Sequence, residues 1–361
     1  MSRATLAAMY AMVLIPLCGC LPVELSVSGD GQVLIARQEG FCALDPGKGT
    51  VKNLYVPKKG KPAFALYAPD SKSFLAISSG FEVEVVSVGG EARKLTSAGN
   101  LTYAQWSGDG KYISLTRIAG GKVAPMDENL PELLLVDVAK GGKKTLLANV
   151  GTIHRWFADA KGVLALQIHA KDKDTGQYSG KLVRVDVATG KAKPLALVLG
   201  GKKVFLAVSP DGKKALFTAI KAAKVGEKVP ASSKDSPKLF ELDIAAGSVR
   251  EVMEDVAFAI YSPKGTKVLL GSKKESKGTI ELSVADASLA KKTVVAEDAA
   301  KSVGSTDSRD IYPGWIDENT VHYLGLRAVY GTEGKNVHLI SVGADGKNPK
   351  DLQAAIDAGA K

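Results

Sequence analysis

The chain contains 361 residues, carries a formal net charge of +10 and has 38 glycines but few aromatic residues. This length fits two ordinary domains or one large repeat array. Because the sequence has only three cysteines, the composition excludes a disulfide-rich scaffold, and it shows neither long acidic blocks nor low-complexity tails. Lysines are scattered in glycine-containing turns. We interpret them as residues that keep a β-rich protein soluble and block edge pairing. The alternative interpretation is that they attract anionic surfaces.

An apolar segment opens the chain. Met-Ser-Arg, with one positive charge at Arg3, precedes an apolar run over residues 4–17. The run is shorter than the roughly 20 apolar residues that a membrane-spanning helix needs. A charged start followed by a short apolar stretch and small residues is typical of a secretory signal peptide.

The end of this segment, Leu17-Cys18-Gly19-Cys20, resembles the lipobox of bacterial lipoproteins. The resemblance implies that residues 1–19 are a signal peptide, cleaved before Cys20, and that Cys20 carries a lipid anchor. An ordinary signal peptide with two incidental cysteines is the alternative. Leu21 stands where inner-membrane retention would require Asp. We therefore expect the cell envelope, with the periplasmic leaflet of the outer membrane or the cell surface favoured in a Gram-negative cell.

Residues 20–361 contain an internal repeat, which indicates a repeat architecture. The unit is best kept at Ser209-Pro210-Asp211-Gly212-Lys213, which leads into the apolar residues 215–217. Six further copies are recognisable along the chain at separations of 39 to 53 residues. The equivalent positions are residues 30, 70, 109, 159, 211, 264 and 317.

Each unit predicts four short strands, A to D. A turn with Asp and Gly joins strands A and B, because these residues supply the positive φ of tight hairpins. Alternating apolar and β-branched residues mark the strands, and a short helix is expected only near Leu352–Ile356. We therefore expect an all-β fold, a single β-propeller domain with seven four-stranded blades. The blades are expected near residues 22–60, 61–99, 100–148, 149–200, 201–254, 255–301 and 302–361.

The Ser-Pro-Asp-Gly-Lys turn resembles the WD40-like repeat of TolB-type propellers, and the resemblance covers essentially the whole chain from Pro22 onward. It implies the architecture, and binding to envelope proteins, but transfers no partner-binding motif. The chain has no room for the extra N-terminal domain of TolB. The hydrolase domain that follows such repeats in prolyl-oligopeptidase relatives is not expected either, because the sequence contains no Gly-x-Ser-x-Gly elbow.

Long segments are expected on one face only, the face of the B–C and D–A loops. The B–C loops are expected at residues 119–131, 170–180, 221–237 and 327–335. Residues 221–237 have the composition of a spacer. The D–A segment at residues 302–313 is the better candidate for binding, because binding residues concentrate on loops over a rigid scaffold. Its proposed partner-binding residues are Asp307, Arg309, Asp310 and Tyr312.

The lipid position constrains the orientation. Strand A of the first blade is expected near Val23, so the tether after Cys20 reaches about 10 Å at roughly 3.4 Å per residue. Since strand A begins on the long-loop face, that face is expected to lie close to the membrane. Labels at residues 230 and 212 test this orientation, and deeper membrane proximity for residue 212 would contradict it.

Catalytic and metal-binding chemistry has little support. The histidines His154, His169, His322 and His338 have no metal-ligand spacing, and residues 172–176 lack the closing Glu of a calcium loop. The three tryptophans, at or just before the A–B turns, are expected to pack between blades. Cys42 lies in an apolar strand and is expected to be an inert buried thiol. No cofactor, metal or nucleic-acid partner is expected.

The sequence thus favours a non-enzymatic, lipid-anchored envelope propeller that acts as a protein-protein interaction platform. Its expected contacts are the membrane, through the lipid on Cys20, and an envelope protein. The alternative is an enzyme or a carbohydrate-binding protein with its site in the axial funnel. Fold alone does not choose between the two, because propellers host many functions.

Overall fold

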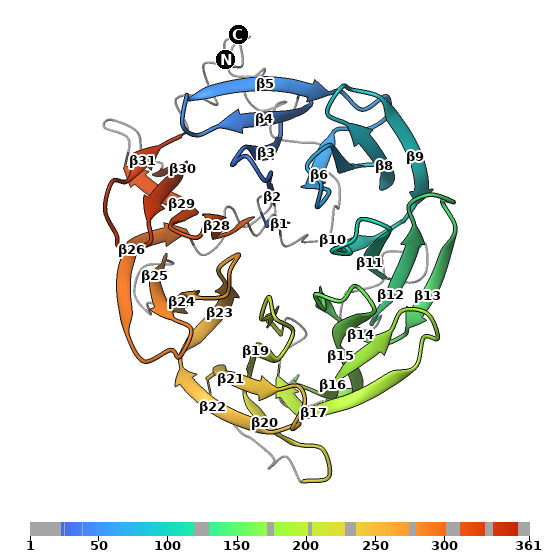
Figure 1. The fold of residues 1–361 in the computed structure, drawn as a ribbon, viewed down its shortest axis with the longest axis vertical. Helices are drawn as coiled ribbons and strands as arrows, with labels where there is room; N and C mark the ends of the chain where they lie inside the picture. The colour runs from blue at the N-terminus through green and yellow to red at the C-terminus, as the bar shows by residue number, and fades with distance from the viewer. Residues whose placement is uncertain are drawn as a thin grey trace, which may run out of the picture.

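The computed structural model describes residues 23–24, 26–37, 39–118, 130–171, 177–200, 204–227, 236–273, 279–300, 311–328 and 335–352. These residues form a ring of seven four-stranded β-blades around a central axis, and no helix occurs among them (Figure 1). The expected all-β fold with seven blades is confirmed. Residues 353–356 of the expected short helix lie outside the described part.

Blades 1 to 3 each contain four consecutive antiparallel strands, with the first strand nearest the axis. The strands of blade 1 are β2 (Ser26–Val27), β3 (Val33–Ala36), β4 (Phe41–Asp45) and β5 (Thr50–Tyr55); those of blade 2 are β6 (Pro62–Tyr67), β7 (Ser73–Ser78), β8 (Glu82–Ser87) and β9 (Ala92–Ser97); and those of blade 3 are β10 (Leu101–Trp106), β11 (Tyr112–Ile118), β12 (Pro131–Asp137) and β13 (Lys143–Leu147).

Blade 4 gains a fifth strand from the blade 5 segment. Blade 4 consists of β14 (Val150–Trp156), β15 (Gly162–Lys171), β16 (Tyr178–Asp186) and β17 (Ala192–Gly200); blade 5 of β18 (Leu206–Val208), β19 (Lys214–Ala219), β21 (Lys238–Asp243) and β22 (Val249–Glu254). The extra strand β20 (Lys221–Lys224) leaves blade 5 after β19 and pairs antiparallel with β17 of blade 4. The expectation of a spacer is therefore wrong for residues 221–224, because the open edge of β17 offers their backbone hydrogen-bond partners.

Blades 6 and 7 form one continuous sheet. Blade 6 contains β23 (Val256–Tyr261), β24 (Lys267–Lys273), β25 (Thr279–Asp286) and β26 (Lys292–Ala300); blade 7 contains β28 (Gly314–Asp317), β29 (Thr320–Ala328), β30 (Lys335–Gly343) and β31 (Lys350–Asp351). The two blades join where Ala299 of β26 pairs with Gly325 of β29. The strands of blades 4 and 7 also extend further into the B–C segments than the sequence predicted, with β15 ending at Lys171 and β29 at Ala328.

The ring closes through the N-terminal strand. Strand β1 (Val23–Glu24) pairs parallel with β27 (Ile311–Tyr312), directly before the inner strand β28 of blade 7. A separate apolar cluster joins Val33 and Leu44 of blade 1 to Leu339 and Leu352 at the end of blade 7. Backbone pairing and apolar contact thus fasten the two ends of the ring together.

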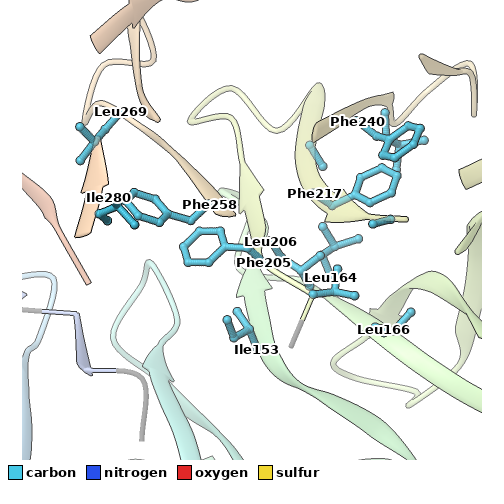
Figure 2. Close-up of a cluster of buried hydrophobic side chains, with 14 of the residues drawn as sticks. Ile153, Leu164, Leu166, Phe205, Leu206, Phe217, Phe240, Phe258, Leu269 and Ile280 are labelled. Carbon is cyan, nitrogen blue, oxygen red and sulfur yellow. The ribbon is translucent and has the colours of Figure 1, made fainter. Parts of the chain in front are cut away.

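The core consists of the apolar layers between neighbouring blades. The first three strands of the blades supply its fully buried residues, because these strands pack against the neighbouring blades. Figure 2 shows this for blades 4 to 6, where Phe205, Phe258 and Ile153 lie together near the axis and Phe217 stacks on Phe240 further out. The outer strands of blades 2 and 3 face solvent, apart from the single leucines Leu95 and Leu146.

Candidate functional site

The two faces of the ring differ in the construction of their connections. The A–B and C–D turns are tight, and they share one face, which we call the tight-turn face. The D–A and B–C connections share the opposite face, which we call the long-loop face. Strand β1 pairs with β27 at the start of blade 7, where the D–A connection arrives, and therefore lies on the long-loop face.

The A–B turns on the tight-turn face repeat one hydrogen-bond pattern. In blade 5 the Ser209 hydroxyl donates to Asp211 Oδ1 at 2.6 Å, and the amide of Lys213 donates to the same oxygen at 3.0 Å. These bonds lower the pKa of the Asp211 carboxyl. Gly212 takes a φ of 71°, the left-handed conformation that glycine adopts without steric cost. The carboxylates of this face thus maintain the turns.

Blade 6 lacks this aspartate and takes its carboxylate from blade 7. Lys264 stands in the aspartate position, and Glu318 of the neighbouring A–B turn accepts from the Ser262 hydroxyl at 2.7 Å and the Lys264 amide at 2.8 Å. The Thr266 hydroxyl also donates to Glu318. Burial opposes ionisation of Glu318, but these hydrogen bonds outweigh it and lower the pKa. Glu318 therefore belongs to the scaffold.

The three tryptophans join neighbouring blades, as the sequence predicted. The indole N–H of Trp106 donates to the Leu66 carbonyl of blade 2 at 3.1 Å, and that of Trp315 donates to the Ile260 carbonyl of blade 6 at 3.1 Å. The indole N–H of Trp156 donates instead to the Ser114 hydroxyl of blade 3 at 2.7 Å. All three side chains are buried, so none presents a flat ring for a ligand.

The inner strands bring one cation and several aromatic rings together near the axis. The guanidinium carbon of Arg155 lies 5.3 Å from the Tyr103 ring centroid and 5.5 Å from that of Phe205. The Phe205 ring lies 5.6 Å from that of Phe258 (Figure 2). Arg155 is 7% exposed, and it is the only arginine or lysine in the described inner strands. A desolvated guanidinium between two rings gains about 2 kcal/mol from cation–π attraction.

The sequence did not lead us to predict this axial cluster, although the repeat contains a regular aromatic position that indicates it. Tyr103, Phe205 and Phe258 each stand three residues before the end of an inner strand. Tyr312 has the same offset from Trp315. An alignment of the seven inner strands by their ends would have indicated an aromatic position near the axis.

Two histidines are buried, with opposite hydrogen bonding. His154 Nε2 lies 2.6 Å from the Ser114 hydroxyl, and its Nδ1 lies 2.7 Å from that of Thr116. Neither ring nitrogen of His322 has a hydrogen-bond partner in the described part of the chain. A Cβ added at Gly314 would lie 2.8 Å from His322 Nε2, so glycine is needed there. Burial lowers the pKa of His154 to about 3 and that of His322 to about 4, and both rings are neutral at neutral pH.

The remaining expected residues lie as the sequence predicted or outside the described part. Cys42 is fully buried in β4, where burial raises the pKa of its thiol and its Sγ lies 3.0 Å from Asn53 Oδ1. His338 Nδ1 lies 2.7 Å from Asp351 Oδ2. Tyr312 belongs to β27, whereas Cys20, Asp307, Arg309 and Asp310 lie outside the described residues. Among the described side chains, no three His, Cys, Asp or Glu residues lie close enough together to hold a metal ion.

Two grooves open between blades on the tight-turn face. One, of about 390 Å³ between blades 2 and 3, is lined by Pro69, Asp70, Trp106 and Asp109. The other, of about 590 Å³ between blades 6 and 7, includes Lys267, Asp286, Lys291, Asn319 and Asp345 in its lining. Both of these grooves thus lie on the tight-turn face.

Within the described part of the chain, no helix is present that could cross a membrane.

The described ring is a seven-bladed β-propeller, and several solved structures, a TolB among them, are similar to it in fold. An oligogalacturonate lyase in complex with manganese is similar over 89% of this chain and 88% of its own, with 13% identity and a TM-score of 0.66. An oligogalacturonate lyase from Vibrio parahaemolyticus covers 84% and 86%, with 11% identity and a TM-score of 0.58. TolB from Acinetobacter baumannii covers 89% and 78%, with 16% identity and a TM-score of 0.51.

At these identities the similarity shows the fold alone. No protein-family model matches the chain, and no curated protein matches it either. The function therefore has to be inferred from the residues of this chain.

Proposed function

We propose that the protein is a lipid-anchored envelope propeller that serves as an interaction platform for another envelope protein. The observation that carries this proposal is the attachment of the N-terminal strand. Only two residues separate Cys20 from β1, and β1 is paired to β27 beside the inner strand of blade 7. A lipid on Cys20 would therefore be held within about 10 Å of the long-loop face.

The orientation that follows leaves the tight-turn face free for a partner. That face carries the two grooves, and its turns are stiffened by hydrogen-bonded carboxylates, so little ordering is needed on binding. Asp307, Arg309, Asp310 and Tyr312 of the segment before blade 7 are kept as a second proposed partner contact.

The anchor is tested by growing cells with labelled fatty acid. We expect the label on the wild-type chain and none on the Cys20→Ala variant, and an unlabelled wild-type chain would contradict the proposal.

The interaction platform is tested by photo-crosslinking from position 70 in one groove and from position 310. We expect a specific adduct from at least one site. Failure of both sites and of a membrane pull-down would count against it.

A second function, recognition of an anionic ligand at the axis, is supported by Arg155. Its guanidinium, between Tyr103 and Phe205, suits a carboxylate, as an acidic sugar would present. The similar solved structures include oligogalacturonate lyases. Oligogalacturonates should bind the wild-type chain in calorimetry and bind Arg155→Gln at least tenfold more weakly. If the wild-type chain shows no heat of binding, this function is excluded for that ligand.

A further inference from the structure

The connection between blades 1 and 2 is longer than three of the later D–A connections. It spans residues 56–61, between β5 and β6. The corresponding connections that are fully described between later blades are residues 98–100, residues 148–149 and residue 255 alone. The blade architecture therefore does not require six residues in a D–A connection.

The connection combines an exposed apolar side chain with three exposed lysines. Val56 is 65% exposed, the largest value among the large hydrophobic residues of the described ring. Lys58, Lys59 and Lys61 follow and are all exposed. No salt bridge joins these three lysines to a carboxylate within the described ranges. Glu82, whose pKa Lys59 helps to lower, already has Lys94 Nζ at 2.6 Å.

The backbone holds this connection in place. The Lys61 amide donates to the Ser79 hydroxyl at 2.9 Å, and the Ser79 amide donates to the Lys61 carbonyl at 2.7 Å. At the base, a Cβ on Gly40 would lie 2.6 Å from the Tyr55 carbonyl oxygen, so the B–C turn of blade 1 packs closely there. The lysines are thus presented on an ordered support, which reduces the entropic cost of binding.

The connection lies on the same face as the N-terminal strand. It is a D–A connection, and β1 joins the ring at β27, where the D–A connection of the last blade arrives. The apolar and basic side chains therefore occupy the face from which a lipid on Cys20 would extend. This part of the argument rests on the proposed anchor, but the chemistry of the loop does not.

We propose that residues 56–61 form a membrane-contact loop that binds the head groups of anionic phospholipids. Lys58, Lys59 and Lys61 attract the negative surface, and Val56 enters the interface. Each lysine near such a surface strengthens binding about fivefold, so the three together contribute on the order of 100-fold.

The test uses the chain from residue 20 onward with Cys20→Ser, which keeps the whole described ring and carries no lipid. Binding is measured by co-sedimentation with vesicles of phosphatidylglycerol and phosphatidylethanolamine, and with phosphatidylcholine vesicles. We expect binding to the anionic vesicles that weakens at high salt, and none to the neutral ones. The triple variant Lys58→Gln, Lys59→Gln, Lys61→Gln should bind on the order of 100-fold more weakly.

The matched control is Lys72→Gln, Lys111→Gln, Lys213→Gln, which removes the same charge from the tight-turn face. It should bind as the parent chain does, and Val56→Ser should lower binding severalfold at unchanged net charge. The proposal is overturned if the parent chain ignores anionic vesicles, even if the loop crosslinks to a protein. Equal loss in both triple variants also overturns it. Because the chain tested has no lipid, a failure of Cys20 acylation leaves this result unchanged.

Discussion

Two junctions between blades reach similar packing by different means. Between blades 3 and 4, neutral buried groups bond to one another: His154 contacts the hydroxyls of Ser114 and Thr116, and Trp156 donates to Ser114. Between blades 6 and 7, backbone pairing at Ala299 and the carboxylate of Glu318 join the blades.

The two junctions also differ in the hydrogen bonding of their buried histidines. Neither ring nitrogen of His322 has a hydrogen-bond partner among the described residues. Both ring nitrogens of His154 lie within hydrogen-bond distance of a hydroxyl of blade 3. The comparison predicts that equivalent substitutions at the two junctions differ in their effects on stability.

The largest expected effect is the loss of stability at acid pH. Both buried histidines have folded pKa values, about 3 and about 4, below the usual 6.5. The unfolded chain therefore binds more protons than the folded one, so the stability is full above about pH 6.5 and falls as pH drops below it. Two such groups together lower the free energy of unfolding by about 2.7 kcal/mol for each pH unit between about pH 6 and pH 4.5.

Urea unfolding at a series of pH values measures this slope. His322→Leu should halve it, because burial alone lowers the pKa of that ring. An unchanged slope in His322→Leu would show that His322 does not titrate as a buried neutral group, which would remove half of the comparison.

The next largest expected effect is the difference in stability between the same substitution at His154 and at His322. His154→Leu leaves the buried hydroxyls of Ser114 and Thr116 with lost partners, and should lower the free energy of unfolding by about 3 kcal/mol. His322→Leu removes two polar atoms that have no partner, and should change it by less than about 1 kcal/mol. Denaturant midpoints at neutral pH measure both. Equal losses would mean that hydrogen bonding does not distinguish the two sites.

A smaller effect on stability is expected at Glu318, the carboxylate that blade 7 supplies to the turn of blade 6. Glu318→Gln should lower the free energy of unfolding by about 1–2 kcal/mol, because it weakens the charge-assisted bonds to the Ser262 turn. Lys264→Asp in the same chain supplies a carboxylate from within the turn, as Asp211 does in blade 5, and should restore most of the loss. Thermal unfolding of the single and double variants tests this. No recovery would indicate that Glu318 acts otherwise than through the turn.

The smallest expected difference between the two junctions is in the loss of stability when a tryptophan is replaced by phenylalanine. Trp156→Phe and Trp315→Phe each remove one indole hydrogen bond between blades, to the Ser114 hydroxyl and the Ile260 carbonyl, and each should cost about 1 kcal/mol. Chemical unfolding followed by circular dichroism measures both changes without depending on tryptophan fluorescence. A difference of more than about 1 kcal/mol between them would show that the junctions also differ in apolar packing.

Much of the scaffold could be predicted from the sequence because its signals are local. The Asp-Gly turns, the strand alternation and the positions of the tryptophans depend on neighbouring residues. Strand β20 could not be predicted in this way, since the four residues 221–224 form a strand only against the edge of β17, which is remote in the chain. Arg155 was missed for a similar reason: its ring partners, Tyr103 and Phe205, come from two other blades.

The sequence by itself determined the repeat, the number of blades and the expected position of Cys20 before the first strand, because each is set by residue order and short-range backbone chemistry. Only the tertiary structure decided which groups meet across the blades. It placed Glu318 against the turn of blade 6, paired β1 with β27 and left His322 without a hydrogen-bond partner among the residues that the structure describes. These contacts depend on the closure of the ring, which brings together residues far apart in the chain.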